Sequence, residues 1–250
     1  MPVNEGISKE NEMIESLNDK RVCELSNNLK NLIHALFGLL DEEEIITCEK
    51  QDIYIKPDFK ITYKGESKYI SMKTGRSESI HQETVKDFVL FLRSLGISKK
   101  TQGTILLYHY GDGTMDGTGK KRYEYEDLRK MLKERIIEAN IELNSSQEII
   151  EKTFERCLFL GNRENAIEID GIYYGTYEFG VLTTKKQIMK HVLRKNWNYI
   201  STPHIGPLQI RPHARYVNKP IRDPHRRERT DIYWANFGDD LEFMSKRYDY

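Results

Sequence analysis

Apolar and polar residues alternate on both sides of Gly65, which predicts a β-hairpin with one buried and one polar face. Gly65-Glu66 is expected to form the two-residue turn, because a type II′ turn prefers glycine first. This turn would place Asp58 opposite Lys73 and Lys60 opposite Ser71. The other face would carry the apolar side chains Phe59, Ile61, Ile70 and Met72.

Helical spacing of apolar residues predicts helices over 8–40, with a break near Asn27-Asn28, and over 79–95, where Gly96 ends the pattern. A short strand is expected at 42–48 and a buried strand at 104–110. The glycine-rich segment 111–119 predicts a flexible loop. Later elements are expected as helices within 125–159 separated at 144–146, strands at 166–177 and 181–182, a helix at 185–193, and short strands at 208–210 and 231–234.

Composition indicates a polar globular protein. Of 250 residues, 38% are hydrophobic and 31% are charged, and the apolar runs are too short to span a bilayer. The acidic segment 1–15 lacks the pattern of a secretory signal. The three cysteines lie far apart and form no CxxC pair, so we expect a reducing cytoplasm and neither a disulfide framework nor a structural zinc site.

Charge is unevenly distributed along the chain although the formal net charge is zero. Segment 185–230 holds twelve lysines and arginines and two acids, Asp223 and Glu228, which gives about +10. The remainder of the chain must sum to about −10. A basic segment within a neutral protein predicts a surface that faces an anionic partner.

The residues best suited to form a catalytic site are Asp58, Lys73 and Glu83. A carboxylate that binds a divalent cation and a lysine that orients water are the groups needed to hydrolyse a phosphodiester. Ser71 stands two residues before the lysine and cannot supply a second charge. Glu83, expected in the first turns of the helix after the hairpin, is placed to do so, and His81 is expected to contact phosphate or hold a water molecule.

At Pro57-Asp58 and Ser71-Met72-Lys73 the chain resembles the PD-(D/E)XK nuclease superfamily, with serine in the acidic position. Some restriction endonucleases of this superfamily carry an SxK strand and take the missing carboxylate from the following helix, the role that the resemblance gives to Glu83. The resemblance covers about residues 20–110 and is moderately specific. It implies an α/β fold with a restriction-endonuclease-like core, a mixed central β-sheet flanked by helices, and a basic C-terminal lobe.

The expected organisation is N-terminal helices and nuclease core in 1–125, then a helical segment, the remaining strands and the basic DNA-binding lobe in 126–250, as one continuous domain. The resemblance implies a Mg²⁺-dependent endonuclease that cleaves duplex DNA, of the type II restriction kind, acting as a homodimer. Asp58 and Glu83 would bind the metal, and Lys73 would orient the attacking water. Residues expected at the DNA are Ser71, His81, Lys120, Lys121, Arg211, Arg215, Arg222, Arg226 and Arg227.

Other interpretations use the same residues. The chain could be a catalytically inactive DNA-binding protein that retains the nuclease fold, for which Ser71 is the best evidence. Asp58 and Lys73 could form a cross-strand ion pair worth under about 1 kcal/mol. An enzyme acting on RNA would use the same site. A phosphate-binding loop at 111–121 is disfavoured, because the spacing GxxxxGK[ST] is not met.

Overall fold

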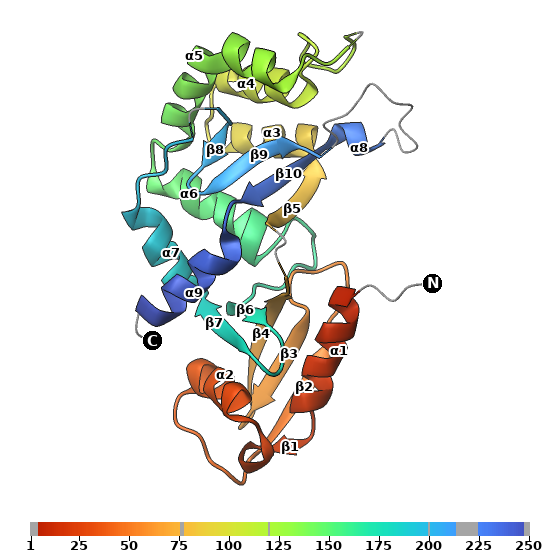
Figure 1. The fold of residues 1–250 in the computed structure, drawn as a ribbon, viewed down its shortest axis with the longest axis vertical. Coiled ribbons are helices and arrows are strands. Elements are labelled where there is room, and N and C mark those ends of the chain that lie inside the picture. Colours follow the sequence, from red (N-terminus) through yellow and green to blue (C-terminus); the bar gives the residue numbers. More distant parts are fainter. Residues whose placement is uncertain (1–4, 76–77, 120, 200, 214–224, 248–250) are drawn as a thin grey trace. The chain divides into compact units, whose positions relative to one another are not determined.

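The computed structural model describes residues 5–75, 78–119, 121–199, 201–213 and 225–247 (Figure 1). The chain divides into two compact units. The first comprises Met1–Glu78, Glu155–His191 and Asn236–Tyr250, and the second comprises Ser79–Phe154 and Val192–Ala235. Each unit is therefore assembled from separate stretches of the chain, and residue 125 lies inside the second unit.

A mixed six-stranded sheet forms the centre of the first unit, in the order β1-β2-β3-β4-β6-β7 among the described residues. Neighbouring strands run antiparallel except β4 and β6, which are parallel. The strands are β1 (Lys20–Arg21), β2 (Ile45–Lys50), β3 (Phe59–Tyr63), β4 (Glu66–Lys73), β6 (Gly171–Gly175) and β7 (Gly180–Thr184). This mixed sheet and its flanking helices confirm the expected α/β class.

Helices α1 (Glu5–Leu17) and α2 (Asn27–Phe37) contribute to one apolar core with this sheet (Figure 1). Met13 and Leu17 of α1 pack in the same cluster as Phe59 and Met72 of the hairpin. The predicted apolar face of the hairpin is therefore confirmed. Helix α9 (Phe237–Arg247) contacts β6 and β7, and a π-helical turn (Glu155–Phe159) and most of α7 (Lys185–Arg194) complete the unit.

The second unit is built on an antiparallel sheet of four described strands in the order β5-β10-β9-β8. These strands are β5 (Ser79–Thr84), β10 (Arg229–Trp234), β9 (Leu208–Pro212) and β8 (His204–Ile205). Its helices are α3 (Val85–Ser94), α4 (Lys99–Tyr110), α5 (Tyr125–Leu143), α6 (Gln147–Phe154) and α8 (His225–Glu228). Helices α4 and α5 pack on each other through Tyr108, Leu128, Leu132 and Ile136.

Two expected elements have the wrong secondary structure. The segment before Val85 is strand β5 and not the start of a helix, because α3 begins only where the Thr84 hydroxyl accepts the Asp87 N–H. The expected strand at 104–110 belongs to helix α4, which Ser98 caps by accepting the Thr101 N–H. A short apolar run fits a buried helix as well as a buried strand.

The other expected elements agree more closely with the structure. The break in the first helical stretch spans 18–26, where β1 and a short 3-10 helix (Val22–Glu24) separate α1 from α2. The helices α5, α6 and α7 and the strands β6, β7, β9 and β10 lie where the pattern predicted them, with ends shifted by a few residues. Among the described residues, no helix combines the length and the apolar character needed to cross a membrane.

Candidate active site

Asp58 lies directly before β3, and the neighbouring strand β4 holds its carboxylate. Oδ2 of Asp58 accepts hydrogen bonds from the Ser71 hydroxyl at 3.0 Å and from the Met72 backbone N–H at 2.6 Å. The backbone N–H of Asp58 donates to the Ile70 carbonyl at 2.8 Å. Because both side-chain hydrogen bonds end on Oδ2, β4 fixes the orientation of the whole carboxylate.

The turn of this hairpin is Lys64-Gly65 and not the expected Gly65-Glu66. Tyr63 pairs with Glu66 across the turn. Lys64 and Gly65 have φ angles of 49° and 79°. A type I′ turn requires positive φ at both central residues, and its twist suits the two strands.

This turn shifts the strand pairing by two residues from the expected register. Lys60 pairs with Tyr69 rather than Ser71, and Asp58 is bonded to Ser71 rather than standing opposite Lys73. A shift of two residues keeps every side chain on its face, because side chains alternate with period two. Asp58, Ser71 and Lys73 therefore still share the polar face, but the directly opposed Asp58–Lys73 pair is wrong.

Strand β6 fixes the other edge of β4. Ser71 and Lys73 pair in parallel with Ile172 and Tyr174. Ser71 is 4% exposed, and Lys73 is half-buried at the end of the strand. The serine is therefore a buried partner of Asp58, while the lysine lies where β4 reaches the surface.

Glu10 on α1 belongs to the same group, although the sequence patterns did not select it. Its pKa is raised, first because the carboxyl is partly buried and then because the negative charge of Asp58 is near. Lys50 and Lys73 oppose this rise with their positive charges. The available signal was the position of Glu10 on the stripe of α1 that continues to Met13 and Leu17, where an apolar residue is expected.

The fold is similar to that of a restriction endonuclease. One matching structure is the crystal structure of restriction endonuclease MspI in complex with its cognate DNA, with a TM-score of 0.45 and 13% sequence identity. The match covers 82% of this chain and 76% of that chain. No family model matches the sequence, and no curated protein matches it.

Glu83 and His81 lie in the second unit and contact each other. Nε2 of His81 is 3.2 Å from Oε1 of Glu83, and their side chains are 9% and 3% exposed. The expected helical position of Glu83 is wrong, since the residue lies on β5 and pairs with Thr230. The structure thus brings Asp58 to Ser71 in one unit and Glu83 to His81 in the other.

The carboxylates of the first unit could provide only part of a metal site. Among the described residues, no group of three or more His, Cys, Asp or Glu side chains could hold a metal ion. Mg²⁺ commonly takes only one or two protein carboxylates together with phosphate oxygens and water. Glu10 and Asp58, whose like charges interact, offer such a pair.

Two of the residues expected at DNA are exposed in the second unit. Lys121 and Arg226 both reach the surface. Arg211 instead stacks on the Tyr233 ring, with its guanidinium 3.8 Å from the ring centroid, and its Nε donates to the Gln209 side chain at 3.0 Å. Three further expected residues, Lys120, Arg215 and Arg222, lie outside the described residues.

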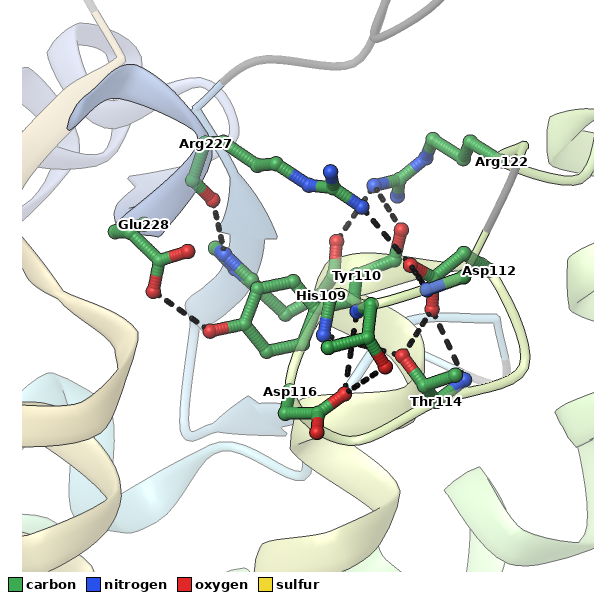
Figure 2. A network of polar contacts seen from close by, with 11 residues as sticks. His109, Tyr110, Asp112, Thr114, Asp116, Arg122, Arg227 and Glu228 are labelled. Carbon is green, nitrogen blue, oxygen red and sulfur yellow. Dashed lines mark hydrogen bonds and ion pairs between the residues drawn. The ribbon is translucent and has the colours of Figure 1, made fainter. Parts of the chain in front are cut away.

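Arg227 is part of a polar network around the loop 111–119 (Figure 2). Its Nη2 lies 2.9 Å from Oδ2 of Asp112, whose side chain is fully buried. The Asp112 carboxylate also accepts hydrogen bonds from Thr114 and from the Gly119 N–H. Burial alone would raise the pKa of Asp112, but these hydrogen bonds and the Arg227 charge hold that pKa below its ordinary value.

The same network joins helix α4 to α8 (Figure 2). Nε2 of His109 is 2.8 Å from the Arg227 carbonyl, and the Tyr110 hydroxyl donates to Glu228 at 2.7 Å. Arg122 donates to the Tyr108, His109 and Tyr110 carbonyls at the end of α4. Much of the positive charge around this loop therefore stabilises the fold of the second unit.

Proposed function

We propose that the chain is a Mg²⁺-dependent endonuclease that hydrolyses phosphodiester bonds in duplex DNA, as a type II restriction enzyme does. The observation that carries the proposal is the Asp58 carboxylate, which Ser71 and Met72 hold on the strand that ends at Lys73. Glu10 lies close enough to Asp58, Lys50 and Lys73 for their charges to affect its pKa. Two interacting carboxylates favour a cation between them, and nearby ammonium groups favour an anion. A phosphate bound through magnesium satisfies both demands.

Each residue has a distinct role in this proposal. Asp58, oriented through Oδ2 by Ser71 and Met72, would hold the metal through Oδ1, and Glu10 would add a second carboxylate oxygen. Bound Mg²⁺ would supply Lewis-acid polarisation of the phosphate. Lys73 would hold the attacking water and stabilise the negative charge that develops on the phosphate oxygens.

The role of Glu83 as a metal ligand rests on sequence spacing alone. Glu83 differs from Glu10 in its surroundings, because it contacts His81 within the second unit. Glu83 and Glu10 are therefore compared directly in the experiment below.

A second function, DNA binding without cleavage, is favoured by the Ser71 hydroxyl. Ser71 donates to Asp58 where the motif of active enzymes commonly has a carboxylate, so Asp58 has a structural partner that needs no metal. Such a protein would retain DNA in a salt-sensitive manner and would not nick it in the presence of any divalent cation.

The decisive experiment is cleavage of supercoiled plasmid DNA with Mg²⁺ or without it. We expect Lys73→Ala and Asp58→Asn to lower the cleavage rate by about a hundredfold or more, because each removes a group that acts on the phosphate or the metal. Lys60→Ala is the matched control, since Lys60 lies on the same hairpin and pairs with Glu49 at 2.8 Å.

Three outcomes distinguish the interpretations. Unchanged cleavage by Lys73→Ala would show that the proposed centre is wrong. Binding without nicking by the unmodified chain would favour the inactive DNA-binding protein, and preferential cleavage of RNA would favour an RNA enzyme. Comparison of Glu10→Gln with Glu83→Gln identifies the second metal ligand.

The proposed enzyme would act as a homodimer, because two copies related by a two-fold axis match the two strands of a palindromic site. Sedimentation of the chain with and without a cleavable duplex measures this directly. A monomer that cleaves both strands at the same rate would contradict the dimer.

A further inference from the structure

A cavity of about 680 Å³ lies in the second unit. One wall is formed by α5, with the apolar side chains of Ile137 and Ile141. The segment 195–199, which carries Trp197 and Tyr199, also lines it. A space of this size accommodates a ligand larger than a single side chain.

Two asparagines four residues apart, at the end of α5 and directly after it, also line this cavity. The Asn140 amide donates to the Tyr199 and Thr202 carbonyls and accepts the His204 N–H. The Asn144 amide donates to the His204 carbonyl and accepts the Gly206 N–H. These bonds satisfy the polar backbone of an irregular segment, so the wall is held in place without a ligand.

The aromatic rings of the cavity are also fixed. The indole N–H of Trp197 donates to the Val192 carbonyl at 3.1 Å, and its ring meets fully buried Trp234 edge-on at 6.2 Å between centroids. The Tyr199 ring lies edge-on to His204 at 5.0 Å. Rigid rings of this kind provide stacking surface at a small entropic cost.

The charges in the lining favour an anionic or neutral ligand. Lys195 lies over the Trp197 ring, with Nζ 4.2 Å from the centroid. The described lining residues contribute no aspartate or glutamate. Asn196 and Asn198 add exposed amide groups that can donate and accept hydrogen bonds.

We propose that this cavity binds one nucleobase of DNA that has been unstacked from its neighbours. The two aromatic rings and the isoleucines would contact the flat faces of the base, and the exposed amides of Asn196 and Asn198 its polar edge. Lys195 would interact with the negative charge of the strand. Unstacked bases are held in this way between aromatic and apolar side chains. The choice of DNA as the source of the base rests on the proposed function. The shape and charge of the cavity favour a base independently of that function.

Photochemical crosslinking tests this assignment. A DNA duplex with one 5-iodouracil at a mismatched position, where unstacking costs least, is bound by the full chain without Mg²⁺ and irradiated, and the attached peptide is identified by mass spectrometry. We expect attachment at Trp197 or Tyr199. Attachment only elsewhere, or none from a complex that has formed, would overturn the proposal.

Affinity measurements with variants provide a second test. Tyr199→Leu and Asn198→Ala should reduce the preference for mismatched over fully paired duplex at least about fivefold, because stacking and edge contacts are lost. Tyr123→Leu removes an aromatic ring that is 43% exposed outside the cavity and serves as the control. Equal preferences in all variants, or tighter binding of the matching RNA, would contradict a DNA base pocket.

Plasmid cleavage measured on the same preparations separates this proposal from the proposed function. Crosslinking at the cavity without any Mg²⁺-dependent cleavage would support the pocket and overturn the endonuclease. Mg²⁺-dependent cleavage without crosslinking at the cavity would support the endonuclease and overturn the base pocket.

Discussion

The pKa of Glu10 depends on Asp58, a residue several elements away along the chain. The raised pKa of Glu10 has two causes that add, its partial burial and the negative charge of Asp58. The positive charges of Lys50 and Lys73 lower this pKa, so it depends on both the acidic and the basic residues of the proposed centre. A substitution at Asp58 should therefore be detectable at Glu10.

We predict that Asp58→Asn lowers the pKa of Glu10, because the nearby negative charge is lost while the two lysines remain. Titration of the Glu10 carboxyl carbon by NMR measures this shift. Glu15, exposed on the same helix, provides the reference signal. An unchanged Glu10 pKa would mean that the two carboxylates do not interact.

His109 should make the stability of the chain depend on pH. Burial lowers its pKa from 6.5 to about 4, and the bond to the Arg227 carbonyl only partly opposes this change. Above pH 6.5 the ring is neutral in the folded and unfolded chains alike. As the pH falls toward 4, the unfolded chain takes up the proton first, so about 3 kcal/mol of stability is lost over this interval.

Urea unfolding at pH 7 and pH 4.5 measures this effect. His109→Gln should be less stable at pH 7 but lose less stability on acidification than the unmodified chain. His34→Gln, a change at an exposed histidine, should leave the pH dependence as it was. A parallel loss in all three proteins would show that His109 is not responsible.

At the level of elements, the hairpin turn decides which residues meet. Gly65 has a φ of 79°, and a Cβ at this position would meet nothing within 4 Å. Gly65→Ala should therefore cost about 1–2 kcal/mol through backbone strain alone. Lys64→Asn should stabilise the chain by a few tenths of a kcal/mol or more, since asparagine adopts positive φ readily.

Thermal unfolding of the two turn variants checks this prediction, with Glu66→Ala on the adjoining exposed position as the control. Destabilisation by Lys64→Asn would contradict the type I′ turn and favour the register first expected from the sequence.

Alternation and helical spacing were sufficient to predict the meander β2-β3-β4, its apolar face and most later helices. They failed at β5 and α4, where the deciding information was in the caps. Thr84 with Asp87 marks the start of α3, and Ser98 marks the start of α4. Apolar content alone does not distinguish a buried strand from a buried helix.

The candidate site was predictable only in part. Motif spacing selected Asp58, Ser71 and Lys73, which one hairpin brings together. Glu10 lies nearly fifty residues earlier, and only the packing of α1 on the sheet relates it to Asp58. Long-range packing of this kind leaves only a weak signal in a single sequence, here one acid on an otherwise apolar stripe.

At the scale of the whole molecule, several of the basic residues that the structure describes in 185–230 make contacts within the protein. Lys185 pairs with Glu168, Arg227 pairs with Asp112, and Arg211 stacks on Tyr233. Exposed Arg226 has a different environment from its neighbour Arg227. The two arginines provide a matched test of DNA contact against folding.

We predict that Arg226→Ala affects DNA binding and that Arg227→Ala affects stability. Arg226→Ala should reduce the salt dependence of DNA binding by about one unit of slope and change stability by less than about 0.5 kcal/mol. Arg227→Ala should cost about 2–4 kcal/mol, because the buried Asp112 charge loses its partner. Binding measured from low to high salt, together with urea unfolding, separates them, and equal behaviour of both would contradict the network in Figure 2.

The parallel pairing of β4 with β6 has a consequence for synthesis of the chain. A ribosome must pass residue 175 before the strand that carries Ser71 and Lys73 can gain this neighbour. Until then one edge of β4 presents unpaired backbone groups. A polypeptide released early would thus carry the Asp58 motif on an edge strand that lacks its parallel neighbour.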